Sequence, residues 1–284
     1  MLLIVATAAG IFDRTSGLPI ENETVRGERA VYQGSGLYRY DPAAVAREAI
    51  VWDKVDLFMT APLFAALIVF TKRGSLRARL FLAGLLGYLF YRYLMFATMS
   101  ALNEMFLVYV AIAALAPIAF VLNLSSLDVQ RLPERVSARF PRALFIATAF
   151  LQGGALLILW PARVLSILKA GKFPAELAGM STLETQAIDL ALVVPLSISS
   201  GILLLRKSPW GYLLAAITLA FGFMMCVVIP AWILVPWVEK GSVNWVEAIP
   251  FLAISLLGLF LNVAFYRGLS DTPVDRAPNA EVRR

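Results

Sequence analysis

The sequence predicts an all-α integral membrane protein with about eight transmembrane helices in two parallel four-helix repeats. Three observations lead to this fold class. Sixty per cent of the 284 residues are hydrophobic and only 15% are charged, whereas soluble globular proteins carry about 25% charged residues. Long apolar runs approach or exceed the roughly 20 residues that a helix needs to cross about 30 Å of hydrocarbon. A short motif also occurs twice, at a separation of nearly half the chain.

The repeated motif is an Asp-Leu pair followed, after four residues, by a Pro-Leu pair. It begins at Asp56 and again at Asp189, so Pro62 and Pro195 hold the same position, and the offset is 133 residues. The match predicts that the two halves superpose by a rotation near 180° about the membrane normal, as in transporters with parallel repeats. The alternative is a chance match, because aspartate often caps helices and proline is common in membrane helices.

Eight apolar segments are the candidate membrane helices. Residues 1–12 form a short or truncated first helix, since 12 residues extend only about 18 Å. The other seven lie near residues 55–71, 80–99, 104–124, 143–162, 187–205, 211–238 and 248–266. Residues 55–124 therefore supply the first-repeat helices, and residues 143–266 supply the second-repeat helices. Their runs are continuous, which favours helices over the alternating strands of a barrel.

Basic residues collect in the connections on one side of the predicted bundle. They lie at residues 72–79, in a basic loop at 125–142, and at residues 206–207, which the positive-inside rule assigns to the cytoplasm. Eight spans then place both termini in the cytoplasm, and the expected location is a bacterial inner membrane. The polar tail at residues 267–284 is expected to be disordered. The net charge of +6 is thus explained without a nucleic-acid partner.

Residues 13–54 form the large external loop of this topology. Within it, Asp41 and Pro42 predict a helix start, because an N-cap residue is followed by proline in the first turn. Apolar residues at helical spacing from Val45 to Val55 predict a helix that lies in the membrane interface and turns into the next span. Anchoring is its expected role, with a lid or a partner-docking surface as the alternative.

The first half also carries Tyr88-Leu89-Phe90-Tyr91 and Asn103-Glu104-Met105-Phe106-Leu107 after the first copy of the motif. With these residues, the run from Asp53 to Asn123 resembles a family of bacterial multi-pass membrane proteins that has no assigned activity. The stretch from Asp189 to Tyr212 resembles the second half of the same family. The resemblance implies a fuller first helix than residues 1–12, and it implies no activity.

Five polar residues form the candidate site for a substrate or an ion: Asp56, Arg92, Asn103, Glu104 and Asp189. Helix lengths place all five near the outer side, with Arg92 deeper than the acids. An arginine at this depth is costly unless it is paired, so we expect it to bond to Asp56 or Glu104. The five residues are expected to surround one cavity that opens outward. Asp189 is the better protonatable group, because apolar Met225 stands where the repeat would place a second arginine.

Three further residues are expected to support this site. Tyr88 lies one helical turn before Arg92 and could orient its guanidinium, although packing between helices is the alternative. Pro62 and Pro195 are expected to kink their helices and free backbone carbonyl groups, which can form an ion site or only shape a bundle. The structural alternative for the whole set is a salt-bridge network that holds helices together, with Asp56 and Asp189 capping helix starts.

Histidine is absent and Cys226 is the single cysteine. Disulfides within the chain, zinc sites and histidine-based acid–base chemistry are therefore excluded. No metal, cofactor or catalytic residue is expected. Two aspartates on separate helices suggest an intramembrane aspartyl protease, but the glycine-containing motif of those enzymes is missing. An enzyme is thus the least favoured class.

The most favoured function is a carrier for a small solute or an ion, with an outward-facing polar site. Duplication, paired prolines and ionisable groups within the membrane support it. The alternative is a non-transporting scaffold, assembly factor or sensor, favoured because no polar path continues to the inner side. The expected partners are the lipid bilayer, a small solute or ion, and a membrane-protein partner or a second copy of the chain.

Overall fold

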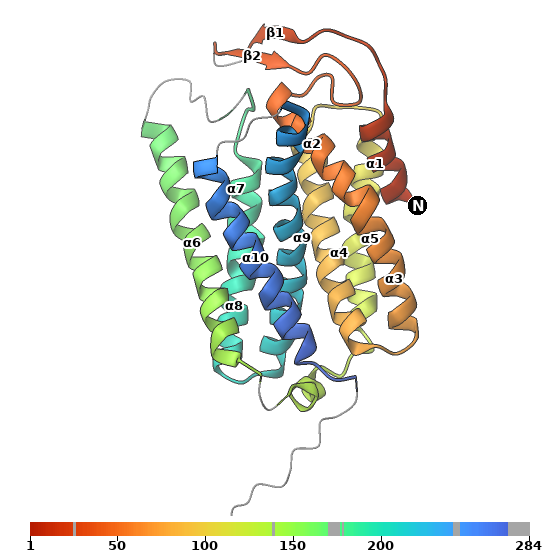
Figure 1. Ribbon diagram of the computed structural model, residues 1–284, viewed down its shortest axis with the longest axis vertical. Coiled ribbons are helices and arrows are strands. Elements are labelled where there is room, and N and C mark those ends of the chain that lie inside the picture. Colours follow the sequence, from red (N-terminus) through yellow and green to blue (C-terminus); the bar gives the residue numbers. More distant parts are fainter. Residues whose placement is uncertain (25–26, 138–139, 170–176, 178, 241–244, 272–284) are drawn as a thin grey trace, which may run out of the picture.

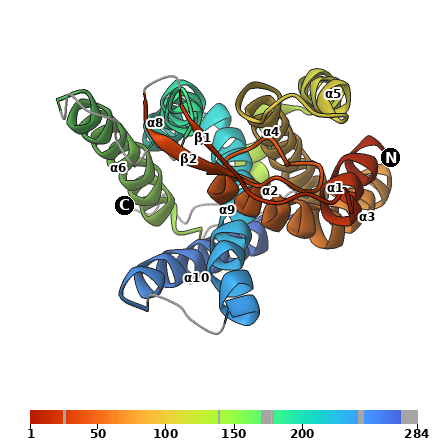
Figure 2. The ribbon, with the colours of Figure 1, turned by 90° about the horizontal axis from the view of Figure 1, so that it is seen from above.

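The computed structural model describes the chain except for residues 25–26, 138–139, 170–176, 178, 241–244 and 272–284. The protein is an all-α bundle whose helices run roughly antiparallel, and a two-stranded hairpin lies across its upper end (Figures 1 and 2). The elements are α1 (Leu2–Phe12), β1 (Ile20–Glu23), β2 (Arg29–Tyr32), α2 (Ala43–Val55), η1 (Asp56–Thr60), α3 (Ala61–Lys72), α4 (Leu76–Met99), α5 (Phe106–Leu124), η2 (Val129–Arg135), α6 (Arg142–Lys169), α7 (Glu184–Ile188), η4 (Asp189–Val193), α8 (Val194–Leu205), α9 (Pro209–Lys240) and α10 (Trp245–Arg267).

Six helical segments of the described chain are long and apolar enough to cross a membrane. They are Ala43–Lys72, Leu76–Met99, Phe106–Leu124, Arg142–Lys169, Glu184–Leu205 and Pro209–Leu234. The segments Leu2–Phe12 and Leu252–Arg267 are apolar but shorter. The protein is therefore a membrane-embedded helical bundle, with six such segments where the sequence predicted eight. Met1 lies beside the upper half of the bundle, and α10 ends at its lower end (Figure 1).

The first of these segments contains the helix that the sequence predicted after Asp41 and Pro42. A helix that lies in the interface and turns into the next span was expected, and α2, η1 and α3 form one continuous helical segment of 30 residues. The face of α2 that carries Ala46, Ala49 and Trp52 is buried within the bundle. The prediction of an interfacial helix rested on apolar residues at helical spacing from Val45 to Val55, and the structure also buries the charged Asp53 on this helix.

Several element boundaries recur at the offset of the repeated motif. The turn η1 corresponds to η4, α3 corresponds to α8, and the first residues of α4 and α9 are equivalent, all 133 positions apart. The connections contain Gly74 with φ 89° and Lys207 with φ 56° at equivalent positions. The helices α3 and α8 run in the same direction (Figure 1). Superposition of two complete four-helix units stays a prediction.

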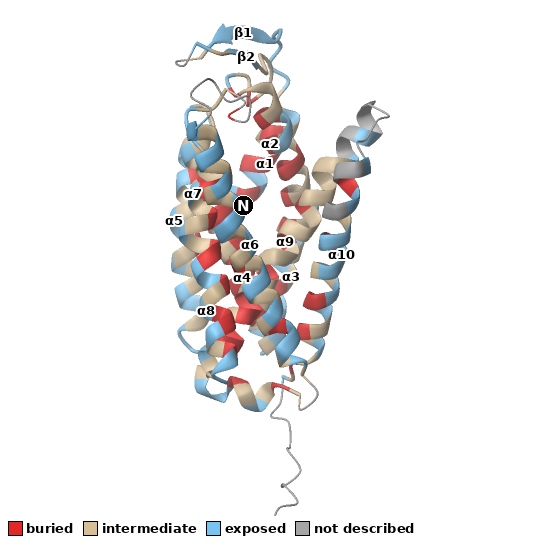
Figure 3. Ribbon diagram, turned by 90° about the vertical axis from the view of Figure 1, so that its left-hand side faces the viewer, coloured by how far each residue is buried: buried red, intermediate tan, exposed pale blue. Residues whose placement is uncertain are grey.

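Helix α4 lies at the centre of the bundle and α6 lies at its edge. In the most apolar stretch of α4, 72% of the residues are buried, against 11% in that of α6. Figure 3 shows buried residues concentrated on the central helices. Gly84 allows α4 to approach α9 closely, because a Cβ there would lie 2.4 Å from the Ala220 Cβ. The chemistry of the bundle therefore depends on which side chains α4 presents.

The lower end of the bundle orders part of the predicted tail. The Asp271 carboxylate accepts the backbone N–H of Leu76 at 2.8 Å, and the Arg77 guanidinium donates to the carbonyl of Leu269 at 2.7 Å. A β-bridge also joins Val136 to Leu269. The prediction of disorder is thus wrong for residues 268–271, which make hydrogen bonds to the start of α4 and to the basic loop. Residues 272–284 lie outside the described residues.

Candidate functional site

Arg92 lies at the centre of a fully buried ion cluster. Its side chain has no exposed surface, nor does that of Asp56, and that of Asp53 is 2% exposed. The Nη2 atom of Arg92 lies 3.3 Å from Oδ1 of Asp53, and its Nε atom lies 3.5 Å from Oδ2 of Asp56. The predicted pairing of Arg92 with Asp56 is therefore present, and Asp53 completes an ion triad that the sequence did not reveal.

Asp56 is held by two hydroxyl donors in addition to Arg92. The Thr60 hydroxyl donates to Oδ1 at 2.7 Å from one turn further along the helix. The Tyr88 hydroxyl donates to the same oxygen at 2.7 Å from α4. Tyr88 was expected to orient Arg92 directly, whereas it fixes the carboxylate with which Arg92 pairs.

Asp53 is held from the opposite side by the external segment. The Tyr38 hydroxyl donates to its Oδ2 at 2.6 Å and lies 3.5 Å from the Tyr109 hydroxyl of α5. Gly10 of α1 makes room for this contact, because a Cβ at that position would lie 1.8 Å from Oδ2 of Asp53. The site therefore requires α1, α2, α4, α5 and the segment between β2 and α2.

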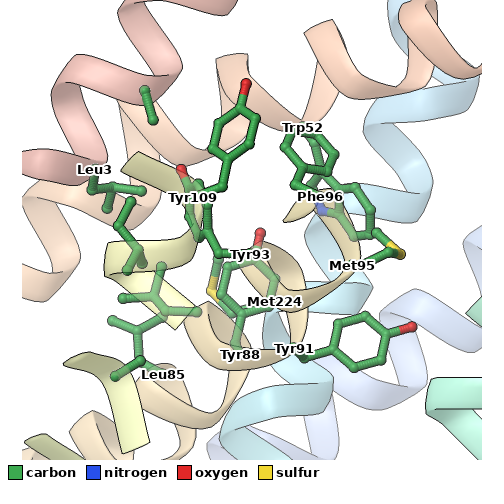
Figure 4. Packing of buried hydrophobic residues seen from close by; sticks show 14 of the residues in the cluster. Leu3, Trp52, Leu85, Tyr88, Tyr91, Tyr93, Met95, Phe96, Tyr109 and Met224 are labelled. Carbon is green, nitrogen blue, oxygen red and sulfur yellow. The ribbon is translucent and has the colours of Figure 1, made fainter. Parts of the chain in front are cut away.

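Aromatic rings enclose the guanidinium group. Its central carbon lies 3.1 Å from the ring centroid of Phe96 and 4.3 Å from that of Trp52. The ring faces of Phe96 and Trp52 carry partial negative charge, so they stabilise a buried cation. Figure 4 shows Trp52 and Phe96 side by side, with Tyr93 and Tyr109 nearby, while Tyr91 points away from this group.

The cluster holds two acids and one base. With all three ionised, Asp53, Asp56 and Arg92 carry a net charge of −1 in an almost completely buried site. An uncompensated charge in such a site costs several kcal/mol, so the group tends to neutralise. One bound proton, on either carboxyl group, would make the cluster neutral.

Asp189 lies apart from this cluster, at the start of η4. Its Oδ1 atom accepts from the Tyr91 hydroxyl at 2.9 Å, and its Oδ2 atom accepts from the Trp160 indole N–H at 2.8 Å. No cation pairs with this carboxylate within the described part of the chain. The residue is 9% exposed, so it is a buried acid held by neutral donors.

Asn103 and Glu104 do not join the buried cluster. Glu104 pairs with Arg39 at the upper surface, and this contact holds the pKa of the glutamate below its ordinary value. Asn103 accepts the backbone N–H of Met105 through its side-chain oxygen at 3.0 Å. The five predicted residues therefore occupy three places, and they do not surround one outward-opening cavity in the described structure.

The external segment is also fixed through Asp41. Its Oδ1 atom accepts the backbone N–H of Ala101 at 2.7 Å, so it ties the start of α2 to the α4–α5 connection. The sequence had predicted that Asp41 caps α2, but its side chain makes no capping hydrogen bond there. Asp41 is 2% exposed. Burial raises the pKa of its carboxyl to about 6.

Both motif aspartates begin a π-helical turn directly before the motif proline. The backbone N–H of Ala61 donates to the carbonyl of Asp56, and that of Val194 donates to the carbonyl of Asp189. Such wide turns are frequent at functional sites. Pro62 and Pro195 follow as the second residue of α3 and α8, and each lies inside a continuous helical segment. The motif therefore encodes a wide turn that presents each carboxyl group.

The sequence missed the residues that complete these two places. Asp53 lay in a segment assigned to the interface, although its spacing of three from Asp56 puts both on one helix face. Tyr38 could not be found, because nothing in a single sequence places an external tyrosine beside a residue of α2. Tyr91 and Trp160 could not be assigned to Asp189 from the sequence, because their link to it depends on how α4 and α6 pack.

Among the described residues, no group of three or more histidine, cysteine, aspartate or glutamate side chains could hold a metal ion. Buried carboxyl groups with neutral or shared donors are typical of proton relays in membrane proteins. No known protein family, curated protein or solved structure matches this chain.

Proposed function

We propose that the protein is a proton-linked carrier of a small solute in a bacterial inner membrane. The excess acid in the Asp53–Asp56–Arg92 cluster carries this proposal. A purely structural ion pair needs one acid for each base, whereas a second buried carboxyl group requires a proton or cation to balance it. Asp189 supplies a second buried carboxyl group, which pairs with no cation in the described chain.

The proposed topology follows from the same framework. Eight apolar segments form two parallel repeats, with α1 and α10 added to the six long segments, and the basic loops at the lower end face the cytoplasm. Recurrent element boundaries at the motif offset support the duplication. The segment around Tyr38 then lies on the outer side and covers the ion cluster. Opening of this segment would admit water and protons from outside.

Proton binding is tested on the purified protein in nanodiscs. Infrared difference spectra across a pH titration should show a protonated carboxyl band that disappears in Asp53→Asn or Asp56→Asn. In proteoliposomes with an enclosed pH indicator, an imposed pH gradient should drive proton entry that both variants reduce at least about tenfold. Tyr93→Phe is the matched control, because the Tyr93 hydroxyl is buried and makes no hydrogen bond in the described structure.

A non-transporting scaffold is the second candidate, because the ion cluster is closed on all sides. Arg92 and Asp56 have no exposed surface, and aromatic rings fill the space around the guanidinium. A scaffold would keep the same protonation state across the titration and show no proton entry. If the Asn variants lost only stability, the carrier proposal would be wrong.

A further inference from the structure

The second copy of the motif carries a carboxyl group whose charge nothing in the described chain balances. Asp189 accepts hydrogen bonds from the Tyr91 hydroxyl at 2.9 Å and from the Trp160 indole N–H at 2.8 Å. Both donors are neutral, and no described arginine or lysine forms an ion pair with this carboxylate. An acid that ionises in such surroundings needs a cation as its partner.

The first copy of the motif shows the kind of partner that such an aspartate takes. Asp56 begins the equivalent π-helical turn, accepts a tyrosine hydroxyl from α4, and lies 3.5 Å from the Arg92 guanidinium. The rings of Trp52 and Phe96 enclose this cation. One motif aspartate is therefore already paired with a guanidinium group among aromatic rings.

The offset between the two copies shows what the second one lacks. At 133 positions further along the chain, Gln186 stands where Asp53 stands, and Met225 stands where Arg92 stands. The second copy keeps the motif aspartate but has neither the second acid nor the base. One positive charge from outside the chain would complete at Asp189 the pair that Arg92 completes at the first copy.

The surroundings of Asp189 favour an organic cation over a metal ion. The Tyr91 ring packs against the Phe221 ring at a centroid distance of 5.2 Å, and Trp160 adds a further aromatic ring beside the carboxylate. Aromatic rings stabilise ammonium and guanidinium groups. Calcium and magnesium ions instead need about six oxygen ligands, and the described residues offer no group of three acidic side chains for them.

Asp189 is also easier to reach than Asp56. It keeps 9% of its surface exposed, whereas Asp56 keeps none. Trp160 belongs to α6, the helix at the edge of the bundle, and is only half-buried. A ligand at Asp189 therefore needs no path through the buried ion cluster.

We propose that Asp189 binds a monovalent organic cation with a primary ammonium or guanidinium group, beside Tyr91 and Trp160. The cationic group pairs with the carboxylate as Arg92 pairs with Asp56. This ligand is the substrate class of the carrier proposed above, so its transport rests on that proposed function, while its binding does not.

Equilibrium binding to the purified protein in nanodiscs of zwitterionic lipid tests the need for a charge. The probes are radiolabelled butylguanidinium and butylurea, which have nearly the same shape but differ by one positive charge. Butylguanidinium should bind at least about tenfold more tightly, because hydrogen bonds between ionised groups are the stronger ones. Equal binding of the two probes, or no binding of butylguanidinium, would overturn the proposal.

Matched changes of an acid to its amide test the position. Asp189→Asn should weaken butylguanidinium binding at least about tenfold, because it removes the charge and keeps the size of the side chain. Glu184→Gln makes the same change five residues earlier in the same membrane segment. It should leave the affinity within about twofold of wild type, since charges that are not in contact are screened.

Equal losses in Asp189→Asn and Glu184→Gln, or wild-type affinity in Asp189→Asn, would assign the cation to another place and contradict the proposal. The comparison of the two probes uses the unaltered protein, so it remains decisive if Asp189→Asn does not fold. Proton entry without butylguanidinium binding would leave the carrier proposal intact and exclude this substrate class. Charge-dependent binding at Asp189 without proton entry would establish the site and contradict the carrier.

Discussion

Asp56 and Asp189 hold equivalent positions in two π-helical turns, and each accepts a hydrogen bond from a tyrosine of α4. Tyr88 donates to Asp56, and Tyr91 donates to Asp189. The two tyrosines are three residues apart on α4 and both pack against Phe221, while their hydroxyl groups reach two different carboxyl groups. The acids are thus equivalent in sequence and local backbone, but only Asp56 has a cation beside it.

Arg92→Met should strongly destabilise the fold, because it leaves Asp53 and Asp56 buried without a counter-charge. Loss of one partner from a buried pair costs about 3–5 kcal/mol. Thermal unfolding in detergent measures this effect. Adding Asp53→Asn and Asp56→Asn to Arg92→Met should recover most of the loss, and a triple variant as unstable as the single one would show that Arg92 acts through its ring contacts instead.

Removal of either donor hydroxyl should weaken the bundle by a smaller amount. Tyr88→Phe and Tyr91→Phe each leave a buried carboxyl oxygen with one donor fewer, at a cost of about 1–3 kcal/mol. Tyr93→Phe should change stability by less than about 0.5 kcal/mol, since the Tyr93 hydroxyl makes no hydrogen bond in the described structure. Chemical unfolding of the three variants in one detergent gives the comparison. Similar losses in all three would contradict the assigned bonds.

Gly10→Ala should disrupt the ion cluster from α1. The added Cβ would lie 1.8 Å from Oδ2 of Asp53 and 3.0 Å from the Tyr38 hydroxyl. Stability should fall although alanine favours helices over glycine by about 1 kcal/mol. Gly154→Ala is the control, because its Cβ meets nothing within 4 Å, and it should be neutral or slightly stabilising. Equal behaviour of both variants would argue against the tight contact between α1 and Asp53.

Asp41 should make stability depend on mildly acidic pH. Its folded-state pKa is raised to about 6 by burial, so the folded protein binds this proton more tightly than the unfolded chain does. Its contribution is full below the unfolded pKa near 4 and is lost as the pH rises through about 6, by up to about 3 kcal/mol. Asp41→Asn should remove this component from unfolding curves, whereas exposed Glu23→Gln should not.

The proposed orientation predicts which positions an impermeant thiol reagent reaches in intact cells. In a Cys226→Ala background, Ser75→Cys and Ser208→Cys should resist labelling, because both lie in lower-end connections assigned to the cytoplasm. Asn22→Cys in the exposed hairpin should react readily. Labelling at the two serine positions without labelling at Asn22 would reverse the orientation.

The sequence was sufficient for the helical class and for the Arg92–Asp56 pair, because apolar length and the cost of a buried arginine are local properties. It was insufficient to predict which partner each acidic residue pairs with. Glu104 pairs with Arg39 and Asp189 with Trp160, and these choices depend on the rotation of each helix and on the path of the external segment. The π-helical turns were also missed, since proline signals a disturbed helix without specifying its form.

The ion triad also bears on how the chain enters the membrane. Because α4 carries Arg92 within its apolar length, its insertion alone would cost a few kcal/mol on translocon scales. The acids that neutralise it lie in the preceding membrane segment, which the ribosome delivers first. Assembly of α2 with α4 beside the insertion machinery would therefore let two individually costly segments enter the lipid as a pair. Nascent chains that are truncated before Arg92, so that Asp53 has no partner, would remain with the translocon for longer than chains that include Arg92.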